Sequence, residues 1–369
     1  MVEKRWRLLD LGGIEPVATQ AVYEAVALAR SKGIVPDTLV ICWPRSPVVC
    51  VGYFQEVDKE VDVEYCRAKK IPIVRRILGG GAVYLDSNQV FYQVIGQRGS
   101  DAIPVAVESI FGKMLGAPVK TLNEIGIQAT YKPVNDIEVE GRKISGNGAG
   151  EVDGMAILTG NIILDFNYDE MTKILKVPDE KFRDKLVKSL RERVTTVKRE
   201  LGQVPHRQKI MELLVNNFEK TLGVRFDHGV LTKEEQRLLD KLTKEKYASK
   251  EWTYENSSRH PALSQTRIVK ISGRSTIGQG VYKSSGGLIR VSGEFVESSI
   301  NDILISGDFT LIPSNKIPEL EKVLITAKLD DQNLTGIIRK FYESHKIEAP
   351  GSSPGDFARA ILIASGVSH

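Results

Sequence analysis

The sequence has few of the residues on which most catalytic and metal sites depend. Only five histidines occur among 369 residues, and residues 1–205 contain none. Chemistry in this first part of the chain therefore has neither a histidine base nor a histidine metal ligand. The three cysteines, Cys42, Cys50 and Cys66, form no CxxC pair. Their number and spacing argue against a disulfide framework or a thiolate zinc site.

Long apolar runs and excess charge are also missing. No run of eighteen apolar residues occurs, and the first residues lack the apolar core of a secretory signal. We therefore expect a cytoplasmic protein that does not bind a membrane. The net charge is +4, too small on a chain of this length to indicate nucleic-acid binding. Hydrophobic residues make up 41% and charged residues 27%, as in a typical globular protein.

Hydrophobic spacing predicts two α+β domains. Apolar residues at helical spacing predict helices at 20–30, 104–115, 169–176, 180–191, 207–222, 233–246, 317–326 and 333–345, and a segment at 353–364 closes the chain. Short β-favouring runs predict strands at 38–43, 48–51, 71–77, 90–95, 134–139, 144–145, 156–166, 268–271, 288–291 and 306–311. Because a charged helical pattern ends near residue 250, we predict a catalytic domain at 1–250 and a smaller α+β domain at 251–369.

The first motif is Arg75-Arg76-Ile-Leu-Gly79-Gly80-Gly81-Ala-Val-Tyr-Leu-Asp86. Three successive glycines allow backbone N–H groups to approach a ligand closely. The two arginines can supply forked, permanently charged donors to a carboxylate or phosphate. The alternative is a glycine-rich bend with surface arginines, since glycine runs often mark only a turn.

The second motif runs from Lys132 to Gly150 and contains Asn135-Asp136 and Lys143. An amide beside a carboxylate suits an adenine edge, a ribose or Mg²⁺, and Lys143 is a mobile point charge. A solvated lysine in a hairpin is the alternative interpretation. No GxxxxGK[ST] pattern occurs, so the sequence does not support a P-loop. Together the two motifs predict a site for an anionic, nucleotide-like ligand that works without histidine.

These motifs resemble those of the lipoate–protein ligase A family. RRILGGGAVYLD is similar to the family's arginine-pair and triple-glycine segment, and NDIEVEGRKISGNGA resembles its Asn-Asp…Lys-Ile-Ser-Gly block. SGDFTLIP and the ending SSPGDFARAI resemble the C-terminal accessory domain of long-form ligases. The resemblance implies an α+β fold, with a mixed sheet of the biotin/lipoate ligase type flanked by helices and a smaller α+β accessory domain.

The resemblance also implies roles for the matching positions. Lys143 would contact the lipoate carboxylate and the α-phosphate of ATP, and stabilise the charge that develops in adenylate formation. Asn135 and Asp136 would hold the nucleotide, and Asp136 would also be the Mg²⁺ ligand. The other lipoyl-adenylate contacts implied by the motifs are Arg76, Gly79, Gly80, Gly81, Ala82, Val83, Tyr84, Ser145 and Gly146.

The implied reaction has two steps. The enzyme would activate lipoate, or octanoate, with Mg²⁺-ATP and release pyrophosphate. It would then transfer the acyl group to a lysine of a lipoyl domain or of a carrier like the H protein of glycine cleavage.

Two other functions stay open. An octanoyltransferase would take the acyl group from a carrier protein without ATP and could use a cysteine nucleophile. A lipoate-binding adaptor would not turn over, although it would have less need of a cation such as Lys143.

Overall fold

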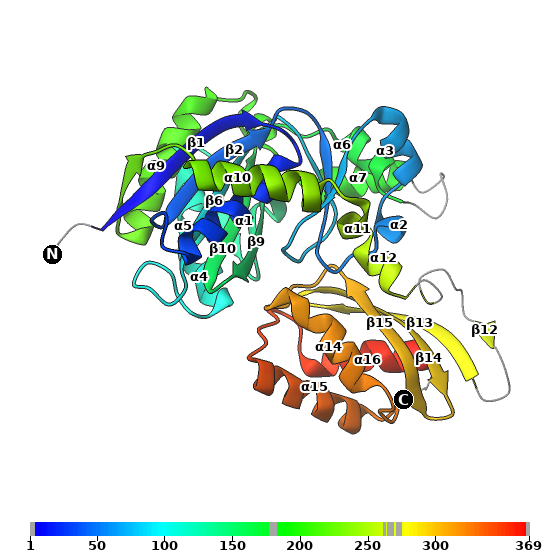
Figure 1. Ribbon diagram of the computed structural model, residues 1–369. Helices are drawn as coiled ribbons and strands as arrows, with labels where there is room; N and C mark the ends of the chain where they lie inside the picture. The colour runs from blue at the N-terminus through cyan, green and yellow to red at the C-terminus, as the bar shows by residue number, and fades with distance from the viewer. Residues whose placement is uncertain (1–3, 177–182, 261–262, 264–268, 271–274, 367–369) are drawn as a thin grey trace. The chain divides into compact units, whose positions relative to one another are not determined.

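The computed structural model describes residues 4–176, 183–260, 263, 269–270 and 275–366 (Figure 1). The start of the predicted helix at 180–191 and the ends of the predicted strand at 268–271 lie outside these residues. The chain forms two compact units. The second contains Thr253–His369 together with Val51–Glu60 and Arg76–Ala82, and the first contains the rest. The functional boundary at residue 250 remains a prediction, but two segments of the predicted catalytic domain pack with the second unit.

The centre of the first unit is a mixed sheet with the strand order β11-β1-β2-β6-β10-β9-β8-β7. β1 runs parallel to β11 and β2, and the other neighbouring strands that pair are antiparallel. The strands are β1 (Arg5–Ile14), β2 (Thr38–Pro44), β6 (Gln89–Gln97), β7 (Thr130–Lys132), β8 (Asp136–Val139), β9 (Arg142–Val152), β10 (Met155–Ile163) and β11 (Arg225–His228). A smaller sheet joins β4 (Ile73–Arg75), β3 (Val48–Val51) and β5 (Val83–Leu85). The predicted α+β class with a mixed sheet is confirmed.

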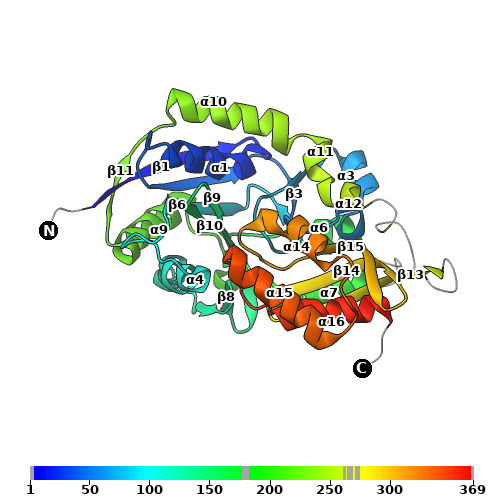
Figure 2. The ribbon, with the colours of Figure 1, turned by 60° about the horizontal axis from the view of Figure 1, so that its bottom comes forward.

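Helices cover both faces of the large sheet (Figure 2). Gln93 donates to Thr19 O in α1 (Ala18–Ser31), whereas the ring of Tyr92 packs on Phe218 of α9 (Arg207–Leu222). Neighbouring residues of a strand point to opposite faces, so α1 and α9 lie on opposite sides of the sheet. α10 (Lys233–Leu242) packs on α1, while α4 (Val107–Met114) and α5 (Gly116–Glu124) pack with α9.

The predicted first helix is buried more completely than an amphipathic surface helix. Eleven residues of α1 are buried, because the helix lies between the sheet and α10. The remaining elements of the first unit are α3 (Val63–Lys69), α6 (Tyr168–Ile174), α7 (Arg183–Arg193), α8 (Val197–Leu201), the π-helical turn η2 (Thr243–Tyr247) and α11 (Lys250–Thr253). None of the helices in the described residues is both long enough and apolar enough to span a lipid bilayer.

The second unit is an antiparallel sheet with the order β12-β13-β14-β15, covered by helices. Its elements are α2 (Val57–Glu60), α12 (Glu255–Arg259), β12 (Val269–Lys270), β13 (Ser275–Ser284), β14 (Gly287–Val296), β15 (Ser299–Gly307), the 3₁₀ turn η3 (Ser314–Lys316), α14 (Ile317–Leu324), α15 (Asp331–His345) and α16 (Pro354–Ser365). The strand predicted at 306–311 lies earlier in the chain: β15 contains only Ser306 and Gly307 of that range and ends at Gly307, where φ is +145°.

Candidate functional site

Lys143 lies on β9, next to the β8–β9 turn at Glu140 and Gly141 that the sequence predicts. Along β8 and β9, Ile137 is opposite Ser145 and Glu138 is opposite Lys143, so Ile144 is an extra residue in β9. This β-bulge shifts the alternation of side chains. A Cβ on Gly146 would consequently lie 3.2 Å from Lys143 Cε, which shows that positions 143 and 146 share one face of the hairpin.

Asp136 forms an ion pair with Lys143. The distance from Lys143 Nζ to Asp136 Oδ1 is 2.6 Å, and 37% and 33% of the two side chains are exposed. The backbone of Lys143 is held from a second side, because Thr195 N donates to its carbonyl oxygen (2.9 Å). The structure thus brings the predicted cation and the predicted metal or nucleotide ligand into contact, in a position that solvent reaches.

A chain of amide groups connects the two motifs within the first unit. Gly146 N donates to Asn161 Oδ1 (2.8 Å), Asn161 Nδ2 donates to Gln89 Oε1 (2.6 Å), and Gln89 Nε2 donates to Tyr84 O (3.2 Å). Sequence analysis missed Gln89 and Asn161. Their only signal is a polar residue in a run of β-favouring apolar residues, which does not reveal a partner.

Ser145 faces the other side of the sheet. Its side chain is buried, and its Oγ lies 3.2 Å from the Tyr92 hydroxyl, on the face that α9 covers. Tyr92 also donates to Asn147 Oδ1, and burial raises the pKa of its hydroxyl. Asn147 and Asn135 bond reciprocally, each through its side-chain NH₂ and the other's backbone carbonyl. A ligand on the Lys143 face could meet Ser145 only through its main chain.

The residues of the first motif divide between the units. Arg76, Gly79, Gly80, Gly81 and Ala82 belong to the second unit. Arg76 turns back on its own segment, and its Nη2 donates to Gly79 O (2.7 Å) and Gly81 O (2.9 Å).

The end of the motif belongs to the first unit. Val83 is 38% exposed and can contact an apolar ligand. Tyr84 is buried edge-on against Phe166, and burial, followed by the charge of Asp86, raises the pKa of its hydroxyl.

All three cysteines of the sequence are buried, and none of them forms a disulfide. Burial, with a smaller effect of Asp10, raises the pKa of Cys42. Burial and the carboxylates of Asp62 and Glu170 raise the pKa of Cys66 to about 11. Reactive thiols are typically exposed and have a lowered pKa, so neither environment favours a nucleophile.

No cluster of three or more His, Cys, Asp or Glu side chains in the described part of the chain could hold a metal ion. The single carboxylate of Asp136 suits an ion that arrives with its own ligands. Mg²⁺ commonly binds through one or two carboxylates and substrate phosphates.

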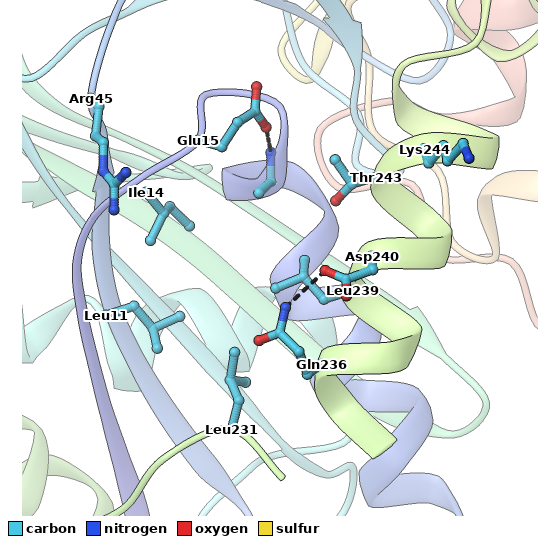
Figure 3. Close-up of a pocket in the computed structure, with 11 residues that line it drawn as sticks. Leu11, Ile14, Glu15, Arg45, Leu231, Gln236, Leu239, Asp240, Thr243 and Lys244 are labelled. Atoms are coloured by element: carbon cyan, nitrogen blue, oxygen red, sulfur yellow. Dashed lines mark hydrogen bonds between the residues drawn. The ribbon is translucent and has the colours of Figure 1, made fainter. Parts of the chain in front are cut away.

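One cavity of about 490 Å³ lies between β1, the start of α1 and α10 (Figure 3). Leu11, Ile14, Leu231 and Leu239 contribute apolar surface. Glu15 accepts a hydrogen bond from Ala18 N (2.8 Å) at its rim. No residue predicted for the site lines this cavity.

Comparison with known proteins places this geometry in context. Residues 15–219 match the family described as the lipoyl protein ligase A/B catalytic domain. The chain is 29% identical to an octanoyltransferase LipM from Kyrpidia tusciae, over 68% of this chain and 98% of that protein. Among solved structures it resembles the bi-partite lipoate protein ligase of Thermoplasma acidophilum, which is described with its E2 lipoyl domain. The TM-score is 0.61 and the identity 28%, and the match covers 73% of this chain and 100% of that one. A lipoate-protein ligase A bound with ATP gives TM-score 0.58 and 27% identity over 69% and 99%.

Proposed function

Since this chain belongs to the lipoyl protein ligase A/B catalytic family, we propose that it is an ATP-dependent lipoate–protein ligase. In the first step a lipoate carboxylate oxygen attacks the α-phosphorus of ATP, and pyrophosphate leaves. In the second step a lysine amine of the acceptor attacks the carbonyl carbon of the mixed anhydride, and AMP leaves. Neither step requires a histidine or a covalent bond to the enzyme.

The burial of every cysteine carries this proposal. A transferase that holds the acyl group as a thioester needs a thiolate that its acyl donor can reach. Cys42, Cys50 and Cys66 are at most 1% exposed, and the sequence contains no other cysteine. Activation by ATP supplies a good leaving group instead, so the enzyme needs mainly to position its substrates and stabilise charge.

Lys143 is the proposed catalytic residue. Its ammonium, 2.6 Å from Asp136, offsets the repulsion between the lipoate carboxylate and the α-phosphate as the two anions approach. Asp136 keeps this cation at the hairpin and contacts the Mg²⁺ that enters as Mg²⁺-ATP. The contact of Lys143 with Asp136 supports both roles, because a single movement of the lysine side chain lets its ammonium leave the Asp136 carboxylate and contact the substrate.

The other contacts are proposed from the two motifs. Asn135 binds the nucleotide, Val83 and Tyr84 contact the acyl tail, and Ser145 and Gly146 line the site through their main chain. Arg76 and Gly79–Ala82 of the first motif contact the acyl-adenylate. The structural neighbour bound with ATP supports ATP as the nucleotide substrate. The neighbour described with an E2 lipoyl domain supports a lipoyl domain as the acceptor.

The second candidate is an octanoyltransferase, because the relative from Kyrpidia tusciae carries that name. In that reaction a thiolate attacks the thioester of an acyl carrier, the carrier's thiol leaves, and the acceptor's lysine amine then attacks the enzyme thioester. The two candidates differ in their need for ATP and for a cysteine.

A cysteine-free variant separates the two candidates. We expect the full-length chain with Cys42→Ala, Cys50→Ala and Cys66→Ala to retain pyrophosphate release that depends on lipoate, because no thiol takes part. Release is measured with Mg²⁺-ATP and lipoate, octanoate or biotin, and acceptor acylation is measured by mass spectrometry. Acylation from octanoyl carrier without ATP, lost in the cysteine-free protein, would establish the transferase instead.

Asn161 should support Lys143 indirectly, through Gly146 N. Asn161→Ala removes one hydrogen bond to the hairpin and should lower kcat/KM for pyrophosphate release about tenfold, the equivalent of one such bond. Asn161→Asp keeps the acceptor oxygen for Gly146 N and should be affected less. Equal activity in wild type and Asn161→Ala would show that this bond does not position the hairpin.

A further inference from the structure

The triple-glycine segment packs on the main chain that follows β15 in the second unit. Gly80 N donates to Phe309 O (3.3 Å). A Cβ on Gly79 would lie 2.4 Å from Phe309 O and 2.8 Å from Thr310 Cα. A side chain at position 79 cannot occupy space that these backbone atoms already fill. This glycine is therefore required by contact inside the protein, before any ligand is considered.

Arg76 holds the same segment from within. Its guanidinium donates to the carbonyl oxygens of Gly79 and Gly81. Gly80 has φ +95°, and a Cβ there would meet Arg76 Nη2 at 2.8 Å. The arginine and the glycine with positive φ together close the turn, so residues 79–81 are held in one backbone conformation.

A buried aromatic cluster fixes the position of Phe309. Its ring is fully buried, stacks on Phe54 at 4.5 Å between ring centres, and meets Phe357 edge-on at 5.1 Å. Gly307 N also donates to Phe54 O (3.1 Å). Phe54 comes from the segment 51–60, which joins the second unit together with the glycines. The carbonyl oxygen that accepts the hydrogen bond from Gly80 N thus belongs to a residue whose ring is held in a buried aromatic cluster.

We propose that Phe309 is a positioning residue for the ligase reaction, an inference that rests on the proposed function. Its buried ring sets the place of its carbonyl oxygen, and that oxygen sets the conformation in which Gly79–Gly81 receive the acyl-adenylate. Phe309 itself touches no reacting atom.

The test compares two variants of the full-length chain that each remove one buried ring from the same core. Phe309→Leu alters the ring that anchors the glycines. Phe341→Leu alters a ring of α15 that lies on His345 (4.1 Å). Three quantities are measured: Tm, amide hydrogen exchange of Gly80 without ligand, and Kd for a non-hydrolysable lipoyl-adenylate analogue by calorimetry.

We expect Phe309→Leu to speed exchange at Gly80 and to raise the Kd, each by about tenfold, the equivalent of one hydrogen bond. Phe341→Leu should lower Tm comparably and leave both other quantities within about twofold of wild type. If both variants weaken binding equally, or if exchange at Gly80 is unchanged in Phe309→Leu, the positioning role is overturned.

A second pair of variants leaves the aromatic core intact. Gly79→Ala should speed exchange at Gly80, whereas Gly336→Ala should not, because an added Cβ at position 336 meets nothing within 4 Å. Normal exchange in Gly79→Ala would also overturn the proposal. Failure of the wild type to bind the analogue or release pyrophosphate would instead refute the ligase function. The exchange data, taken without ligand, would still decide whether Phe309 shapes the segment.

Discussion

Replacing Lys143 with alanine should lower kcat/KM for lipoate-dependent pyrophosphate release by about 10²–10³-fold, the usual effect of removing one group that stabilises transition-state charge. The ammonium lies 2.6 Å from the Asp136 carboxylate, on the face of β9 that Lys143 shares with Gly146. Without it, carboxylate and α-phosphate would approach with their mutual repulsion uncompensated. Release is followed with Mg²⁺-ATP and lipoate over a range of concentrations of each.

Lys132 provides the matched control, because it lies on β7, which pairs with the other side of β8 in the same sheet. It pairs with Glu138 (2.9 Å), and 59% of its side chain is exposed. Lys132→Ala should therefore keep activity near that of wild type. Circular dichroism and Tm establish that both variants are folded. A Lys143→Ala protein that is folded and as active as Lys132→Ala would remove Lys143 from the mechanism.

Glu235→Ala should lower the free energy of unfolding by about 3–5 kcal/mol, the usual result of breaking a buried ion pair by removing one partner. The Glu235 side chain is fully buried, and its oxygens accept hydrogen bonds from Arg7 Nη1 (2.9 Å) and Nη2 (2.5 Å). Glu235 also completes the cap of α10, since it accepts from Thr232 N (2.8 Å). The variant would leave the Arg7 guanidinium buried without its carboxylate and the helix without its capping box.

The same pair gives stability a defined dependence on pH. Burial alone would raise the pKa of Glu235, but hydrogen bonds from Arg7 and Thr232 outweigh burial and leave the pKa below its usual value. A carboxyl with a lowered pKa in the folded state stabilises the fold at pH values above its unfolded pKa. This stabilisation is lost as pH falls through the folded pKa. Wild type should therefore lose stability on acidification below about pH 4.5 more steeply than Glu235→Ala.

Urea unfolding at several pH values measures both effects. Glu234→Ala is the control, because Glu234 lies on the same helix and pairs on the surface with Arg237 (2.7 Å). It should change stability far less than Glu235→Ala. Equal effects of the two substitutions would show that the Arg7–Glu235 pair does not hold α10 to β1.

Local sequence patterns determined much of the secondary structure. The apolar residues at helical spacing predicted α1, and the Glu140-Gly141 turn between two β-favouring runs predicted the hairpin that carries Lys143. These elements depend on neighbouring residues, so their signals are local. β1 escaped prediction because Arg5, Arg7 and two glycines obscure its apolar pattern. Arg7 is nevertheless buried, and its guanidinium forms an ion pair with Glu235, far away in the sequence.

Other features were decided by contacts between distant residues. The bulge at Ile144 gives Lys143 the same face as Gly146, whereas simple alternation along β9 would place them on opposite faces. Asn161 and Gln89 join the motifs only because β6 and β10 pair. The order of residues cannot reveal these pairings, since each depends on strand register.

The sequence by itself thus determined the family resemblance, the two motifs and the chemistry their residues can perform. It also fixed the number of cysteines, but only the tertiary structure showed that every one is buried and poorly suited to act as a nucleophile. The glycines illustrate the same division. Their run is visible in the sequence, but their attachment to Phe309, more than two hundred residues later, arises from packing of the second unit, because backbone contacts leave no signal in the order of side chains.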